Sequence, residues 1–404
     1  MTAAPRTLLP ALLLVLALLL LPAYAHGQLR EPQTRAQAAI VVDGATGEVL
    51  YQSRPDARRA IASTTKLMTA LLVLERAEPG AVLRAADYDA APVESQIGLR
   101  RGERMAVADL FEALMLESAN DAAVTLAEGV AGSREAFVDE MNARARELGL
   151  DDTRYVDPIG LDEDNRSSAR DLATLTRLLL RNDRFAEVVD RPTAVLETGA
   201  RRRVVRNRNR LVARQPFVDG VKTGHTRRAG YVLVGSATGR GKQVVSVVLG
   251  EPSEAARDDD SLALLRYGID QYRRVPALRA GRVVRRADVR WFDDAEAALV
   301  TPGDVALTVR RGEQVRTVVD APGELEGPLP AGERVGTVAV VYRGKVVRRA
   351  PLVTAAEVPG AGTVRRLTAV LGVALTLLAI LAIVLASMLV ALRIRAVRRR
   401  RARA

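Results

Sequence analysis

The spacing of apolar residues along the chain predicts a domain built from both helices and strands. Two short runs with strand character, residues 37–42 and 49–52, flank the turn-forming segment 43–48 and predict a β-hairpin. From Ser63 onward, apolar residues recur every three to four positions, as on one face of a helix. Helical spacing returns in residues 107–117, 120–130, 134–148 and the stretch that begins at Ser168. Strand character follows in residues 193–206, 231–237 and 244–250, before a closing helix over residues 253–272.

This order of elements favours an α+β fold for residues 37–275. Strands from the beginning and the end of the region can pair in one mostly antiparallel sheet, and the helices between them can cover it. Pro276 marks a change of pattern. From there to residue 352, valines alternate with Arg or Thr between glycine-rich turns, and we expect a small all-β domain, 276–352.

Residues 1–25 have the layout of a signal peptide. Arg6 precedes an apolar run over residues 8–21, and Ala23-Tyr24-Ala25 supplies small residues at the positions a signal peptidase requires. An uncleaved membrane anchor is the alternative, but the apolar run is short for a bilayer. Residues 26–36 read as a polar linker.

A second apolar segment, residues 367–392, carries no charge and is long enough to cross a bilayer as a helix. Residues 353–366 form the linker that leads to it. The tail that follows, residues 393–404, holds seven arginines, whereas the other flank offers Arg365 and Arg366. By the positive-inside rule, we expect a single-pass protein of the cell membrane with a cytoplasmic C-terminus and an extracytoplasmic catalytic domain.

Net charge and residue usage narrow the chemistry further. The formal net charge of +12 comes mostly from the arginine tail, so nucleic-acid binding is not expected. The chain has no cysteine and two histidines, His26 and His225, which lie far apart in the sequence. This excludes thiolate catalysis and a His-rich or Cys-rich metal site, and we predict neither metal nor cofactor. A Ser-His-Asp triad would have to use His225.

Of the sixty basic side chains, four are lysines, and two of these lie in short motifs: Lys66 ends Ser63-Thr64-Thr65-Lys66, and Lys222 begins Lys222-Thr223-Gly224. A lysine can lose its proton near neutral pH, whereas an arginine cannot. Ser63 lies at the start of a predicted helix with Lys66 one turn later on the same face. Lys66 can therefore serve as a base for Ser63 if its pKa is lowered by burial or by a neighbouring cation, for which Lys222 is the candidate.

Two further segments complete the constellation. Ser118-Ala119-Asn120 lies between two predicted helices and can present a hydroxyl and a carboxamide to a cleft. Lys222-Thr223-Gly224 follows a predicted strand, where Lys222 and Thr223 can hold a carboxylate and Gly224 lets a ligand backbone lie against the strand. The plain alternative is an N-cap serine at position 63 with a solvated lysine.

Together these motifs resemble those of low-molecular-mass penicillin-binding proteins, the D-alanyl-D-alanine carboxypeptidases of the DacA type. The resemblance covers residues 36–275 strongly and the β domain loosely. It extends over residues 41–43, 62–70, 116–123, 141–143, 157–162 and 219–226. It implies a penicillin-recognising serine-transferase fold and removal of the terminal D-alanine from peptidoglycan stem pentapeptides, with β-lactams as covalent inhibitors.

The resemblance also assigns roles to individual residues. Ser63 forms the acyl-enzyme and Lys66 is its base, while Ser118 relays the proton to the leaving D-alanine. Asn120 orients the lysine and the substrate amide.

At the other end of the substrate, the resemblance assigns its terminal carboxylate to Lys222 and Thr223, beside Gly224. The oxyanion hole falls to the backbone N–H groups of Ser63 and His225. The His225 side chain then lies at the cleft rim, because a Ser-Lys pair already supplies a base.

Other readings remain open. A D,D-endopeptidase or a β-lactamase can share the fold, although no glutamate in a matching local motif suggests the deacylating base of a lactamase. A catalytically silent wall-binding protein is the alternative from another class. The basic segment 201–210 is either a contact for anionic wall polymers or a solvated hairpin.

Overall fold

The computed structural model describes residues 29–401, and side chains to residue 399. The predicted signal peptide, residues 1–25, and the end of the tail, residues 402–404, lie outside the described residues. The chain divides after Arg273 into two compact units. The first unit mixes helix and sheet, and the second is built from strands followed by one helix.

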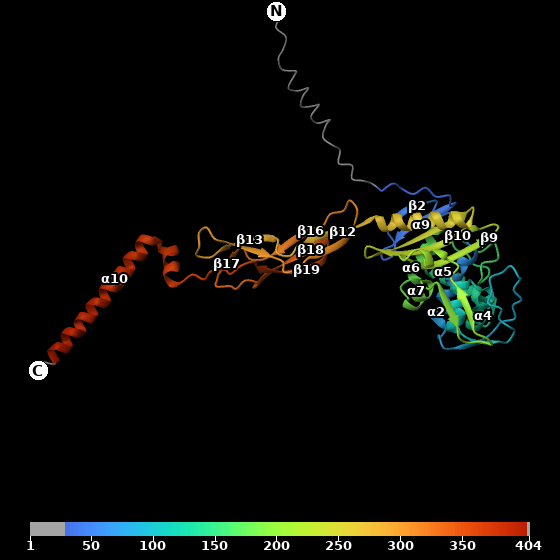
Figure 1. Ribbon diagram of the computed structural model, residues 1–404, viewed down its shortest axis with the longest axis horizontal. Helices are drawn as coiled ribbons and strands as arrows, with labels where there is room; N and C mark the ends of the chain where they lie inside the picture. The colour runs from blue at the N-terminus through green and yellow to red at the C-terminus, as the bar shows by residue number, and fades with distance from the viewer. Residues whose placement is uncertain (1–28, 402–404) are drawn as a thin grey trace, which may run out of the picture. The chain divides into compact units, whose positions relative to one another are not determined.

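A five-stranded sheet brings together the two ends of the first unit (Figure 1). Its strand order is β2-β1-β11-β10-β9, and every pair is antiparallel. β1 (Ala38–Asp43) pairs with β11 (Lys242–Glu251) in a register that places Ala38 opposite Leu249. The other strands are β2 (Val49–Ser53), β10 (Gly230–Gly239) and β9 (Val218–Thr226). The hairpin and the mostly antiparallel sheet predicted from the sequence are confirmed.

Both faces of this sheet are buried, because helices cover each of them. Ile40 and Val42 face one hydrophobic core, and Val41 faces the other. On the Val41 side lies α9 (Glu254–Asp270), the predicted closing helix, while α6 (Ala169–Leu179) packs on the opposite face. The central strands therefore read as continuous apolar runs rather than as an alternating pattern.

Of the remaining helices, α2 contacts α4 and α6, and α4 contacts α3 and α5, whereas α7 and α8 contact β9. Their bounds are α2 (Lys66–Arg76), α3 (Val107–Glu112), α4 (Asn120–Ala131), α5 (Arg134–Glu147), α7 (Asp183–Val189) and α8 (Arg210–Arg214). The first unit also contains three short strand pairs: β3 (Arg59–Ala60) with β6 (Arg166–Ser167), β4 (Val82–Arg84) with β5 (Arg104–Ala106), and β7 (Thr193–Leu196) with β8 (Arg203–Arg206).

The structure departs from the sequence expectations at three places. The predicted helix over 107–117 ends in a π-helical turn, η2 (Ala113–Glu117). The predicted strand over 193–206 is two strands, β7 and β8, joined by a turn. Ser63 lies inside a short 3-10 turn, η1 (Ala62–Thr65), and its side chain caps no helix, so the N-cap alternative is wrong.

The second unit is an all-β domain followed by one helix. A six-stranded sheet has the order β16-β18-β19-β14-β13-β17, and β12 pairs with β15. The strands are β12 (Tyr272–Leu278), β13 (Val283–Val289), β14 (Glu296–Val300), β15 (Val305–Arg310), β16 (Arg316–Asp320), β17 (Glu324–Leu325), β18 (Arg334–Tyr342) and β19 (Lys345–Thr354).

The last element, α10 (Thr363–Arg401), is long and apolar enough to cross a membrane. Its leucine, isoleucine and valine side chains are exposed, as expected for a helix that faces lipid. The backbone leaves the helical conformation at Gly372, with φ of 77° and ψ of 158°. The predicted helix over 367–392 lies within α10, which is interrupted at Gly372.

Candidate active site

The serine and lysine of the first motif lie in consecutive turns at the start of α2. Leu67, Met68 and Leu71 on the first turns of α2 are buried in the core and fix the helix in place. Lys66 is 0% exposed, and its Nζ lies 3.1 Å from Ser63 Oγ. A solvated lysine at this position, the second half of the plain alternative, is thus also excluded.

Lys66 has two further partners, and both can only accept hydrogen bonds. Its Nζ donates to Oδ1 of Asn120 at 2.7 Å and to the carbonyl oxygen of Ile159 at 2.6 Å. A neutral amine has two N–H bonds and one lone pair. With both N–H bonds directed at these acceptors, the lone pair faces the Ser63 hydroxyl. The geometry therefore suits Lys66 as an acceptor of the serine proton.

The electrostatics favour that neutral form. Burial lowers the pKa of Lys66 to about 7, while the charges of Asp157, Glu94 and Asp121 act in the opposite direction. Of the two causes expected from the sequence, burial lowers the pKa, and the charged groups acting on it are the three carboxylates rather than Lys222. The pKa of Lys222 is itself lowered well below its usual value, first by burial and then by the charge of Lys66.

The second motif is positioned by the π-helical turn. After η2 the chain enters the left-handed conformation at Ser118, with φ of 61°, and α4 begins two residues later at Asn120. Ser118 is 5% exposed, and within residues 29–401 its Oγ has no hydrogen-bond partner. Asn120 reaches Lys66 through Oδ1, while its backbone N–H donates to the carbonyl of Ser95 at 2.7 Å.

A loop at residues 157–162 supplies the Ile159 carbonyl. The Asp157 carboxylate accepts backbone N–H groups from Ile159 and Asp162, each at 2.7 Å, and from Gly160. Gly160 has φ of +84°, and a Cβ there would come within 2.0 Å of the Ala62 carbonyl oxygen. Only glycine lets this loop pack against the serine turn. The sequence pointed to this segment through the family resemblance alone.

The third motif lies on β9, the edge strand of the sheet. A Cβ added to Gly224 would come within 2.9 Å of the Ser63 backbone nitrogen, so the motif borders the serine turn directly. Lys222 is 1% exposed and donates from Nζ to the carbonyl of Thr223 at 3.0 Å. An edge strand can pair with an extended peptide.

His225 follows on the same strand with an exposed side chain. Its ring stacks on Tyr231 with centroids 4.0 Å apart and planes inclined by 26°. This contact occupies one face of the imidazole at the surface. It is compatible with the prediction that His225 contributes its backbone N–H.

Two groups of residues at the site were missed from the sequence. Glu94, from the loop between β4 and β5, accepts a hydrogen bond from Nδ2 of Asn120 at 2.7 Å. Arg208 pairs with Glu117 at 2.5 Å, and its charge acts on Lys222. Both depend on loops that close over the motifs, and nothing in local spacing signals them.

The basic segment 201–210 is not fully solvated, because one of its arginines is buried. Arg203 is buried and binds both carboxylate oxygens of Glu103 at 2.8 and 3.0 Å, and it also donates to the carbonyls of Ile97 and Gly98. The segment thus ties the β7–β8 hairpin to the loop that carries Glu94. Contact with wall polymers stays a prediction.

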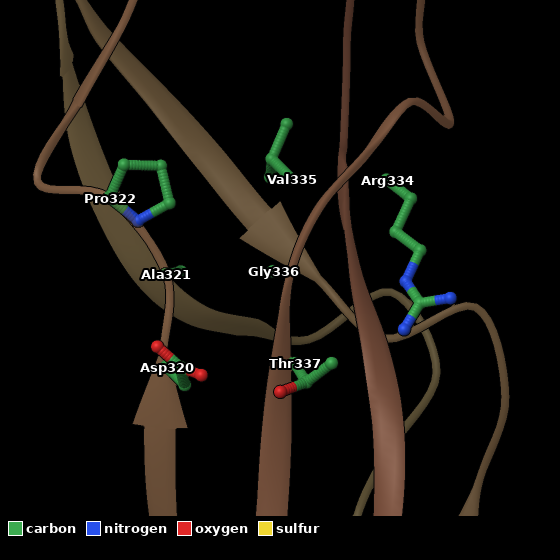
Figure 2. Close-up of a pocket in the computed structure, with 7 residues that line it drawn as sticks. All are labelled: Asp320, Ala321, Pro322, Arg334, Val335, Gly336 and Thr337. Atoms are coloured by element: carbon green, nitrogen blue, oxygen red, sulfur yellow. The ribbon is translucent and has the colours of Figure 1, made fainter.

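Among the described residues, no group of three His, Cys, Asp or Glu side chains could hold a metal ion. A cavity of about 390 Å³ opens in the β domain between the end of β16 and the start of β18 (Figure 2). Its lining residues are Asp320, Ala321, Pro322, Arg334, Val335, Gly336 and Thr337. None of them belongs to the three motifs.

A serine and a buried lysine in consecutive turns, set against a helix-covered antiparallel sheet, define the penicillin-recognising class of serine enzymes. Within this class, the chain belongs to the D-alanyl-D-alanine carboxypeptidase family, whose family model matches residues 26–253. A second model, the penicillin-binding protein 5 C-terminal domain, matches residues 272–360.

Individual relatives agree with this assignment. The chain is 30% identical over 347 residues to D-alanyl-D-alanine carboxypeptidase DacF of Bacillus subtilis, covering 83% of this chain and 89% of that one. It is 34% identical over 345 residues to DacA of Escherichia coli K12, covering 81% and 85%. The solved structure of penicillin-binding protein 5 from Haemophilus influenzae matches with a TM-score of 0.58 and 30% identity, over 83% of this chain and all of that one.

Proposed function

We propose that the protein removes the terminal D-alanine from peptidoglycan stem pentapeptides through an acyl-enzyme on Ser63. The observation that carries this proposal is the contact of the buried Lys66 Nζ with Ser63 Oγ at 3.1 Å, with its other two partners both acceptors. Family membership supplies the substrate class, and the geometry supplies the nucleophile and its base.

Acylation starts when neutral Lys66 takes the proton of Ser63. The serine oxygen then attacks the carbonyl carbon of the penultimate D-alanine, and the N–H groups of Ser63 and His225 stabilise the oxyanion. Preorganised donors of this kind typically contribute a few kcal/mol each to transition-state stabilisation. Ser118, whose hydroxyl is buried at the site, passes a proton to the leaving amine.

The free carboxylate of the substrate is bound at the other end of the cleft. Lys222 and Thr223 on β9 hold it, and Arg208 adds positive charge beside Lys222. The peptide itself extends along the free edge of β9, where Gly224 allows close approach. Water then releases the shortened peptide from Ser63, whereas a β-lactam remains bound as a stable acyl-enzyme.

The apolar helix sets where this reaction takes place. We infer that α10 spans the cell membrane once, with the arginine-rich end in the cytoplasm and the catalytic domain outside, facing the cell wall. Cysteine labelling of single-cysteine variants on either side of α10 tests this orientation, because the chain has no native cysteine. Protection of an ectodomain cysteine from an impermeant reagent in whole spheroplasts contradicts it.

Labelling with a fluorescent penicillin tests the chemistry. The wild-type protein should form one covalent adduct on Ser63, and Ser63→Ala should form none. Absence of an adduct in the wild type favours a catalytically silent wall-binding protein. Release of D-alanine from a pentapeptide, compared with cleavage of a cross-linked dimer, separates carboxypeptidase from endopeptidase. Rapid turnover of the penicillin identifies a β-lactamase.

A further inference from the structure

Glu94 reaches the catalytic amide from a loop that the three motifs do not include. Its Oε2 accepts from Nδ2 of Asn120 at 2.7 Å and also from the hydroxyl of Tyr88. Its Oε1 accepts the backbone N–H of Ala91 at 3.0 Å. Both carboxylate oxygens are therefore held by the protein, and the side chain is directed at Asn120.

This contact determines which end of the Asn120 amide faces Lys66. Asn120 accepts from Lys66 through Oδ1 and donates to Glu94 through Nδ2. If the amide turned over, Oδ1 would face the Glu94 carboxylate and two acceptors would meet. The Nδ2 donor would then face Lys66, which needs an acceptor there. A carboxylate at position 94 thus excludes the inverted amide.

We propose that Glu94 is a positioning residue for acylation, holding the Asn120 amide in the one orientation that offers Lys66 an acceptor. This inference rests on the proposed function of Ser63 and Lys66. The chain of contacts runs from Tyr88 through Glu94 and Asn120 to Lys66, and it couples a loop side chain to the base. Glu94 itself does not exchange protons with the substrate.

The charge of Glu94 adds a second, measurable effect. Lys66 faces Glu94 from the β4–β5 loop, Asp121 from α4, Asp157 from the 157–162 loop, and Lys222 from β9. The three carboxylates all raise the pKa of Lys66 against the effect of burial. Removal of one of these negative charges should therefore lower that pKa.

Two substitutions separate orientation from charge. Glu94→Gln keeps an acceptor oxygen for Asn120 and removes the charge, so the acidic limb of the acylation pH profile should move to lower pH by about half a unit. Glu94→Ala removes both, and the maximal acylation rate should also fall about tenfold because the amide can turn over. The readout is the second-order rate of fluorescent-penicillin acylation as a function of pH. Glu147→Gln, an exposed carboxylate on α5, is the matched control.

The outcomes distinguish this inference from the proposed function. If wild type acylates Ser63 but both Glu94 variants match it in rate and in pH midpoint, the positioning role is wrong. If Glu94→Gln acylates normally and fails only to release the acyl group, Glu94 acts on the deacylating water instead, which also overturns the proposal. If wild type does not acylate, the proposed function itself fails. Tyr88→Phe should reproduce part of the Glu94→Ala loss, and thermal unfolding identifies variants that do not fold.

Discussion

The surroundings of the two motif lysines differ in charge although their burial is the same. Lys66 is 0% exposed and Lys222 is 1% exposed, and burial is the first cause of the lowered pKa of each. The charged groups that act on the pKa of Lys66 are carboxylates, which raise it again. Three of the charged neighbours of Lys222, namely Lys66, Arg208 and Arg257, lower its pKa further, and Glu117 acts in the opposite direction.

This difference fits the two roles proposed for the lysines. Carboxylates bring the pKa of Lys66 back to about 7, where the amine can exchange a proton during each turnover. The cations around Lys222 disfavour its charged form, and an incoming carboxylate would restore that form by offsetting their charge. Lys66 is thus suited to proton transfer, and Lys222 is suited to anion binding.

The largest expected effect is at Lys66. Lys66→Arg keeps the positive charge but removes the lone pair, so acylation should fall by about a thousandfold or more. The measurement is the rate of fluorescent-penicillin acylation together with the intact mass of the adduct. Lys242→Arg is the matched control, since Lys242 lies beside a turn on β11 and away from the motifs. Acylation by Lys66→Arg at the wild-type rate contradicts the assignment of Lys66 as the base.

A second test compares the lysines by pH. Only neutral Lys66 accepts the serine proton, so the acylation rate should rise with pH and level off above its pKa of about 7. Below that pKa the rate should fall about tenfold for each pH unit. The profile is measured with a penicillin whose own ionisation is complete over the range. A rate independent of pH between about pH 5 and pH 8 removes the lysine base from the mechanism.

Substitutions of Lys222 should lower the acylation rate less than Lys66→Arg does, and the size of the loss should depend on the ligand. Lys222→Arg keeps the charge and is expected to lose about tenfold in acylation, while Lys222→Gln loses the charge and about a hundredfold. The decisive comparison uses a β-lactam and its carboxylate ester. The penalty of Lys222→Gln should largely disappear with the ester, because the anion that Lys222 binds is gone. An equal penalty for both ligands points to a structural role.

Elements whose apolar residues recur at regular spacing were predictable from the sequence. Elements that interrupt this spacing were not. The β1–β2 hairpin, α4, α5 and α9 follow their apolar spacing closely. Through residues 107–117 the helical spacing continues, yet the chain widens into the π-helical turn η2 so that Ser118 can adopt a positive φ. Apolar spacing did not signal that change, because the turn still buries its apolar residues Leu114 and Leu116.

The same distinction applies to the site. The sequence pointed to Ser63, Lys66, Asn120 and Lys222 as candidates, because their types are rare or occur in short motifs. It did not identify the Ile159 carbonyl, since every residue has one. Glu94 was missed because its contact depends on the closure of a long loop. These partners become visible only when the tertiary structure brings the loops together.

Glu251, which lies outside the site, is a carboxylate as deeply buried as the two lysines. Burial, followed by the neighbouring Asp260 charge, raises the pKa of Glu251 from 4.5 to about 7. Asp260 is itself held by Arg35 through contacts of 2.6 and 2.7 Å, and its pKa is lowered. If burial is the common cause, it should act on a carboxylate in the opposite direction from a lysine.

The smallest expected effect is on stability. A raised pKa means that Glu251 stabilises the fold fully below about pH 4.5, and this contribution is lost as the pH rises towards 7. Glu251→Gln does not ionise, so its free energy of unfolding should exceed that of wild type by about 2 kcal/mol at pH 8 and match it near pH 4.5. Denaturant unfolding at both pH values measures the difference, with the half-buried Glu254→Gln on α9 as control. A difference that does not change with pH means that folding leaves the pKa of Glu251 unshifted, which contradicts the raised value.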